Sequence, residues 1–156
     1  CKSAVGRVSL TLSDPFCVSR HRNAFGEMIK ADVDLLFCNR AEMLSMYETD
    51  DFDAAMAEAA AEIAIVACTD SANGAYILSG GETWHVPAIP TDIVDATGAG
   101  DLFAGAFLWA LTHGYALEDC GHIGNIAAAE VISHIGARPE ADLTALIAQA
   151  RLRPAT

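Results

Sequence analysis

The sequence predicts an α/β fold: a three-layer αβα, Rossmann-like domain with a mostly parallel sheet. Short apolar and β-branched segments alternate along the chain with helical patterns of about ten or more residues, which is the order that parallel sheets require. The 156 residues are 53% hydrophobic and 19% charged, a composition typical of a chain that buries a core. Repeats and low-complexity linkers are absent from the sequence, so we expect residues 1–156 to form a single domain.

The first part of the chain predicts two strands and two helices. Residues 8–12 (VSLTL) have strand-like alternation that ends at a turn over 13–15. Residues 20–31 place Ala24, Met28 and Ala31 on one face of a surface helix. Residues 33–38 (VDLLFC) predict a buried strand, after which a short helix over 40–47 has Asn39 as its N-cap.

The central part predicts a helix followed by strands. Residues 53–62 are alanine-rich and helical, and residues 63–69 (IAIVACT) predict an apolar strand of the parallel-sheet type. Residues 71–86 (SANGAYILSGGETWHV) predict a turn, a strand, a Gly-Gly hairpin and another strand.

The last part predicts three helices, over 100–112, 117–134 and 141–150. The breaks fall at His113–Gly114 and at Gly136 and Pro139.

The charge and residue counts exclude several classes of function. A formal net charge of −12 argues against a nucleic-acid partner and against an anionic membrane surface. The longest apolar run, Leu102–Leu111, has ten residues, well short of the ~20 that span a bilayer. The histidines lack H-x-x-x-H spacing and no C-x-x-C pair occurs, so neither a zinc site nor a redox motif is indicated.

The first residue and the cysteines indicate how the chain was produced and in which compartment it is found. The chain begins with Cys1 rather than Met and shows no signal peptide, so we interpret it as a fragment or a processed chain. An odd number of scattered cysteines fits reduced, mostly buried thiols in a cytoplasmic protein. The five are Cys1, Cys17, Cys38, Cys68 and Cys120.

The segment from Asp95 to Asp101 (DATGAGD) is the strongest candidate for chemistry. Small residues at a helix start let backbone N–H groups approach an anion, and the helix dipole adds positive potential. A phosphate could bind here without a lysine, which suits an acidic chain. Asp101 would then orient an attacking hydroxyl and accept its proton. Like Asn39 and Thr69–Gly74, this segment is expected at the carboxyl end of a strand, where such sheets bind ligands.

Structural alternatives remain open for the same residues. Acidic residues are common in a helix's first turn, which would account for Asp101, and Asp95 and Thr97 could be turn and N-cap residues. The chain has no G-x-x-x-x-G-K-[ST] motif. A dinucleotide fingerprint over Gly98–Gly105 would need a strand leading to Glu118, and residues 112–120 do not predict one, which weakens an NAD-linked alternative.

These residues resemble a known family. DATGAGDLFAGAFL (95–108) resembles the C-terminal signature of the ribokinase-like (PfkB) carbohydrate and nucleoside kinases, and NRAE (39–42) is similar to their N-x-x-E motif. TDSANGAYIL (69–78) resembles the segment that borders their nucleotide, and NIAAAEVISHIGARP (125–139) their terminal helix. SLTLSDPFCVSRHRNAF (9–25) is most similar to the adenosine-kinase-like branch. The resemblance covers nearly the whole chain and implies that the family's N-terminal part and lid are missing.

The resemblance implies a role for each matching residue. Asp101 would be the catalytic base, and Gly98, Ala99 and Gly100 the anion hole for the transferred phosphoryl group. Asn39 and Glu42 would hold Mg²⁺ through water, and Asp95 and Thr97 would hold K⁺. The nucleotide would be bound by Thr69, Gly74 and Asn125. In structural terms, Asn39 and Glu42 could equally form a capping box, and Asn125 could be an exposed helix residue.

The sequence thus predicts an ATP-dependent kinase, with ATP, Mg²⁺ and K⁺ as cofactors, that phosphorylates a hydroxymethyl group of a sugar or nucleoside. The alternatives are an inactive nucleotide-binding module without an acceptor site and, third, an NAD-linked Rossmann domain. The partner would be a small-molecule substrate, with no nucleic acid and no membrane. An exposed sheet edge can also pair with a second copy of the chain, which would give a homodimer.

Overall fold

The computed structural model describes residues 6–154, which form two compact units. The first unit comprises the residues up to Asp70 together with Tyr76–Trp84, and the second comprises Ser71–Ala75 and the residues from His85 onward. Cys1 lies outside the described residues. Across residues 6–154 no helix combines the length and the apolar character that crossing a membrane requires.

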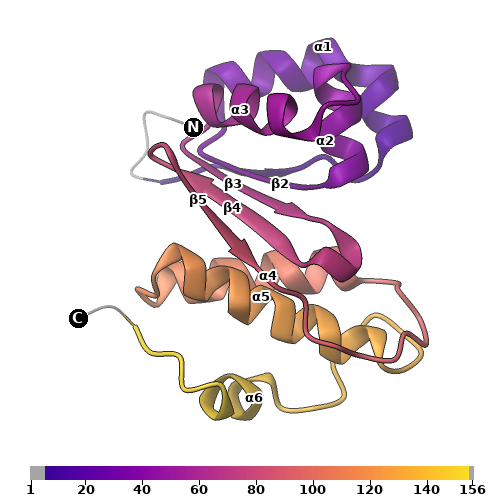
Figure 1. Ribbon diagram of the computed structural model, residues 1–156, viewed down its shortest axis with the longest axis vertical. Helices are drawn as coiled ribbons and strands as arrows, with labels where there is room; N and C mark the ends of the chain where they lie inside the picture. The colour runs from indigo at the N-terminus through magenta and orange to yellow at the C-terminus, as the bar shows by residue number, and fades with distance from the viewer. Residues whose placement is uncertain (1–5, 155–156) are drawn as a thin grey trace. The chain divides into compact units, whose positions relative to one another are not determined.

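A five-stranded sheet runs in the order β1-β2-β3-β4-β5 (Figure 1). Its strands are β1 (Ser9–Thr11), β2 (Leu35–Asn39), β3 (Ile65–Thr69), β4 (Ala75–Ser79) and β5 (Glu82–Val86). The pairs β1–β2 and β2–β3 are parallel, as the alternating pattern predicts. Only Gly80 and Gly81 connect β4 to β5, and a two-residue connection joins antiparallel strands. The predicted α/β class with a mostly parallel sheet is confirmed.

Helices cover one face of the parallel strands of the first unit (Figure 1). They are α1 (Pro15–Asp32), α2 (Arg40–Tyr47) and α3 (Phe52–Glu62). The strands β2 and β3 are almost continuously apolar, as is typical of strands in a parallel sheet. Their side chains and the apolar side chains of the three helices form one core. Fully buried members of this core include Val18, Leu36, Met43, Ala59 and Val66.

Helix α1 differs from the prediction at its start and on its buried face. It begins at Pro15 rather than near residue 20, because Asp14 is an N-cap whose side chain accepts from the Cys17 N–H at 2.8 Å. Proline is favoured at the first helical position, so the Ser-Asp-Pro sequence starts a helix here instead of forming a separate turn. Phe25 and Ile29 are buried, whereas the predicted face is not: Met28 is 44% exposed. The larger Phe and Ile side chains bury more apolar area than the alanines of that face would.

The second unit is built around a helix pair, α4 (Ala99–Thr112) and α5 (Leu117–Ile132), which lie side by side (Figure 1). It also holds a 3₁₀ turn (Ser71–Asn73) and α6 (Leu143–Gln149), which contacts α5. Phe103 and Phe107 of α4 are buried, with ring centroids 6.1 Å apart. Gly124 allows the Phe103 ring to lie close to the backbone of α5, because a Cβ built on Gly124 would lie 2.7 Å from that ring.

We expect Gly124→Ala to destabilise the protein by about 1–3 kcal/mol, because the added methyl group overpacks the contact with Phe103. Gly105→Ala on α4 is the matched control, since a Cβ there meets nothing within 4 Å. Alanine is the better helix former, so the control should be neutral or stabilising by up to about 1 kcal/mol. Urea unfolding measures both variants, and equal midpoints would contradict this account of the helix contact.

Candidate functional site

Asn39 and Glu42 are joined in a reciprocal capping box at the start of α2. The Glu42 N–H donates to Asn39 Oδ1 at 2.9 Å, and the Asn39 N–H donates to Glu42 Oε2 at 2.9 Å. Asn39 Nδ2 also donates to Glu42 Oε1 at 2.6 Å. Burial raises the pKa of Glu42, and the bond from the Asn39 N–H partly offsets this. The structural role considered for this pair is therefore present, and both carboxylate oxygens already have a partner.

The carboxyl ends of β2 and β3 bring Asn39 and Thr69 together, as expected. The two residues are cross-strand partners in the parallel register. Thr69 Oγ1 donates to the Cys38 carbonyl at 3.5 Å. Next to them, Arg40 Nη1 lies 3.2 Å from Asp70 Oδ2, and its guanidinium stacks 4.1 Å over the Phe52 ring. Arg40 was not predicted as a site residue, because one basic residue in a short helix forms no recognisable sequence pattern.

In the second unit, the Asp95 carboxylate holds the loop before α4. Its Oδ1 accepts from the Thr97 N–H at 2.9 Å, and its Oδ2 accepts from the Gly136 N–H at 3.1 Å. Hydrogen bonds from Thr97, and then from Gly136, lower the pKa of Asp95. The Asp95–Thr97 bond is the turn-forming contact considered as a structural alternative. The loop does not directly follow a strand as predicted, because a segment containing Pro87 and Pro90, which cannot donate to a sheet ladder, separates it from β5.

Gly98 is required at the start of α4 for two reasons. It is the N-cap in a left-handed conformation, with φ 83° and ψ −1°, which few residues other than glycine adopt. A Cβ built on it would also lie only 2.7 Å from the Ala137 Cβ. Thus the turn packs closely against the segment after α5, to which Asp95 also bonds.

The first turn of α4 presents backbone N–H groups and one exposed carboxylate. The N-cap makes no side-chain capping bond, and the leading N–H groups of a helix have no partner within it. The Ala99 N–H donates to the Ala96 carbonyl of the preceding turn at 3.3 Å. Such a helix start, with its dipole, favours an anion. Asp101 lies exposed in the same turn. A catalytic base must be accessible to substrate, and Asp101 is accessible. An acidic residue that only interacts with the helix dipole would be equally exposed, so exposure agrees with both interpretations.

Gly74 and Asn125 meet the same backbone segment. Gly74 is buried with φ 94°, and a Cβ there would lie 2.0 Å from the Val86 carbonyl oxygen. Asn125 Nδ2 donates to the carbonyls of Val86 and Pro87 at 3.2 and 3.0 Å. Asn125 is only 7% exposed, so the alternative of an exposed helix residue is wrong.

The predicted site residues fall into two groups, each described within its own unit. Asn39, Glu42 and Thr69 belong to the first unit. Gly74, Asn125 and the segment from Asp95 to Asp101 belong to the second. Within residues 6–154, no three His, Cys, Asp or Glu side chains gather into a cluster that could hold a metal ion.

Comparison with known proteins identifies relatives over most of the chain. Residues 1–143 match the family model described as pfkB family carbohydrate kinase. An uncharacterized sugar kinase of Archaeoglobus fulgidus is 35% identical over 112 residues, which cover 72% of this chain and 45% of that protein.

Solved structures give the same result. A probable sugar kinase from Rhizobium etli is 48% identical with a TM-score of 0.93, over 96% of this chain and 46% of that one. Adenosine kinase from Sinorhizobium meliloti is 43% identical with a TM-score of 0.89, over 92% of this chain and 45% of that one. The chain thus spans about half the length of the relatives that it matches.

We expect Gly98→Ala to destabilise the protein by about 1–3 kcal/mol, because a side chain at this φ is strained and also meets Ala137. Gly100→Ala is the matched control, since a Cβ there meets nothing within 4 Å. Urea unfolding at neutral pH measures both. A Gly98→Ala midpoint equal to that of the control would show that the turn does not need its left-handed glycine.

Asp95→Asn should lower stability at neutral pH but make much less difference in acid. The folded-state pKa of Asp95 is lowered, so its stabilising effect is present above its ordinary value of about 4 and is lost as the pH falls through the folded-state pKa. Urea unfolding at pH 7 and pH 3 measures the difference from wild type. Asp92→Asn, in an exposed position of the same segment, is the control. An Asp95→Asn deficit that is as large at pH 3 as at pH 7 would contradict this role.

Proposed function

The chain belongs to the pfkB family of carbohydrate kinases, and we propose that it is the C-terminal, nucleotide-binding part of an ATP-dependent kinase acting on a hydroxymethyl group of a sugar or nucleoside. One observation carries the proposal. The Asp95–Gly98 turn is held against Gly136 and Ala137, and it starts α4 without a side-chain cap, directly before an exposed Asp101. A capping role alone does not call for this close, glycine-dependent packing.

The proposed reaction is phosphoryl transfer to an alcohol. The acceptor hydroxyl oxygen bonds to the γ-phosphorus of ATP while the bond from that phosphorus to the β,γ-bridging oxygen breaks, and ADP leaves. Asp101 accepts the hydroxyl proton. The N–H groups of Gly98, Ala99 and Gly100 would donate to the oxygens of the transferred group, where negative charge is concentrated. Backbone donors supply this stabilisation without a lysine, in a chain with a net charge of −12.

The proposal assigns metal ions to two sets of oxygen donors. Asn39 and Glu42 would hold Mg²⁺ through water, which fits a buried carboxylate whose two oxygens already accept from Asn39. Bound Mg²⁺ would neutralise phosphate charge. Asp95 and Thr97 would hold K⁺, and the lowered pKa of Asp95 keeps its carboxylate ionised for that role.

The nucleotide would lie against Thr69, Gly74 and Asn125. Gly74 lets its backbone pack directly against the Val86 carbonyl, and the Asn125 amide donates to the Val86 and Pro87 carbonyls, so the two residues hold the same segment. The acceptor class is drawn from the relatives. The Sinorhizobium meliloti protein at 43% identity is an adenosine kinase, so we propose a nucleoside such as adenosine, or a ribose-like sugar, as the substrate.

Asp101→Asn in the full-length protein should lower kcat by about 10²–10⁴-fold and leave the Kd for Mg-ATP nearly unchanged, because only proton acceptance is lost. Asp53→Asn is the control: Asp53 is likewise an exposed acidic residue in the first turn of a helix, α3. An ADP-release assay with adenosine or ribose measures kcat, and calorimetry measures Kd. If Asp101→Asn kept a near-normal kcat, Asp101 would be only a first-turn acid.

A second candidate is a nucleotide-binding module without activity of its own. The chain spans about half the length of these relatives, so this candidate concerns the 156 residues by themselves. The 156-residue chain should then bind Mg-ATP weakly and transfer no phosphate to adenosine or ribose. Robust transfer by the purified chain would contradict this candidate. The relatives named above are sugar and nucleoside kinases, so they lend no support to the NAD-linked alternative.

A further inference from the structure

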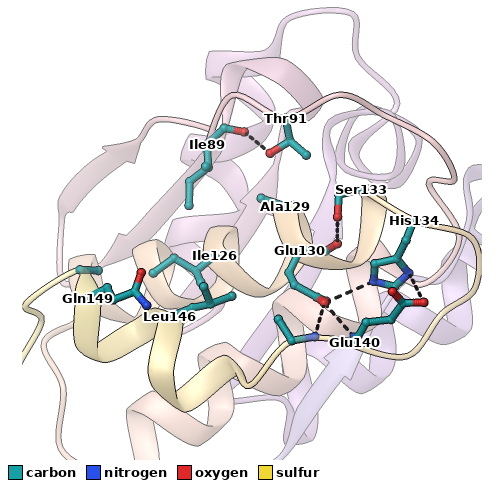
Figure 2. Close-up of a pocket in the computed structure, with 12 residues that line it drawn as sticks. Ile89, Thr91, Ile126, Ala129, Glu130, Ser133, His134, Glu140, Leu146 and Gln149 are labelled. Carbon is teal, nitrogen blue, oxygen red and sulfur yellow. Dashed lines mark hydrogen bonds and ion pairs between the residues drawn. The ribbon is translucent and has the colours of Figure 1, made fainter.

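A groove of about 890 Å³ lies within the second unit, between α5, α6 and the segment around Ile89 (Figure 2). Its walls are mainly apolar and include Ile89, Ile126, Ala129 and Leu146. A volume of this size, lined by apolar side chains and a few polar groups, is typical of small-molecule sites. None of the groove residues belongs to the Asp95–Asp101 segment or to the proposed nucleotide contacts.

Glu130 is the polar residue that sets the chemistry of this groove. Its Oε1 accepts from the N–H groups of Glu140 and Ala141, each at 2.8 Å, and lies 3.3 Å from His134 Nε2 (Figure 2). Its Oε2 is buried without any hydrogen-bond partner, the sole such side-chain atom found in residues 6–154, and the side chain is only 8% exposed. Buried polar atoms nearly always have a partner, so this oxygen is available to a donor that the protein itself does not provide.

The carboxylate of Glu130 is ionised at neutral pH. Burial alone would raise its pKa, but the hydrogen bonds from Ala141 and Glu140 and the neighbouring His134 outweigh burial and lower it. The groove therefore contains a negative charge with one unused acceptor atom.

The other charged groups of the groove favour a cation over an anion. Among residues 6–154, no Lys or Arg lines the groove, whereas Glu140 contributes a second carboxylate, 73% exposed. His134 lies between the two carboxylates, 3.3 Å from Glu130 and 3.9 Å from Glu140. Even a protonated His134 balances only one of them, so a phosphate or a carboxylic acid would meet net negative charge.

We propose that this groove binds a primary amine carried on an apolar body. The ammonium group donates to Glu130 Oε2, and the apolar body lies against Ile126 and Leu146. A charge-assisted hydrogen bond of this kind is about twice as strong as a neutral one. The inference does not depend on the proposed kinase reaction, because the groove shares no residue with that site.

Three probes of matched shape test the proposal: 4-phenylbutylamine, 4-phenylbutanol and 4-phenylbutyrate. Calorimetry without nucleotide should give a Kd for the amine at least about tenfold lower than for the alcohol, with the acid weakest. In methyl NMR spectra of the wild-type protein, the amine should shift the signals of Ile126 and Leu146. Equal affinities for the three probes, no binding of the amine, or methyl shifts elsewhere would each overturn the proposal.

Two variants test whether the Glu130 carboxylate causes the preference for the amine. Glu130→Gln keeps the side-chain shape but removes the charge, so the preference of amine over alcohol should fall to about twofold or less. Glu118→Gln, at an exposed position on the same helix and outside the groove, should retain the full preference. A thermal melt checks that both variants fold. If Glu130→Gln does not fold, the methyl shifts of the wild-type protein decide whether the amine binds in the groove. An undiminished preference in folded Glu130→Gln would overturn the role of this carboxylate.

Discussion

The geometry of the proposed anion site depends on one carboxylate, that of Asp95. Its two oxygens accept from Thr97 and from Gly136, so a single side chain fixes the turn before α4 and ties it to the segment after α5. Gly98 can adopt its left-handed conformation in contact with Ala137 because that segment is held in place. The direction of the first N–H groups of α4, and the position of Asp101 after them, follow from this arrangement.

An acidic protein needs such a device to bind a phosphate. With a net charge of −12, the chain offers no long-range attraction for an anion, so the binding energy has to come from local dipoles or from a bound cation. Backbone N–H groups at a helix start are fixed before the ligand arrives, so they lose little entropy on binding and need no reorganisation as charge develops. The same acidity makes the α5–α6 groove, with its ionised Glu130, a site for the opposite charge.

The sequence predicted the fold class and most elements because hydrophobic periodicity and turn residues are local signals. The helix over 40–47 agrees to the residue, since Asn39 is its N-cap and the strand before it is apolar up to Cys38. Helix α1 was predicted too short, because the Ser-Asp-Pro sequence fits both a turn and a helix start, and in the structure Asp14 caps a helix that begins at Pro15. The family was also recognisable, because its signature is an ordered run of small residues and carboxylates.

Long-range contacts could not be predicted from the sequence. Nothing local indicates that Asp95 bonds to Gly136, that Gly98 meets Ala137, or that Asn125 is buried with its amide on the Val86 carbonyl. Arg40 and Glu130 were overlooked for the same reason. Each acquires its role from partners that are distant in sequence or from a groove that exists only after folding.

The most direct test of the central claim is the response of the backbone amides at the start of α4 to a triphosphate. In ¹⁵N NMR spectra of the full-length protein, adenylyl imidodiphosphate with Mg²⁺ should shift the amide signals of Gly98, Ala99 and Gly100, whereas AMP should leave them nearly unchanged. If saturating triphosphate analogue shifted signals elsewhere but left these three in place, the start of α4 would not be an anion site.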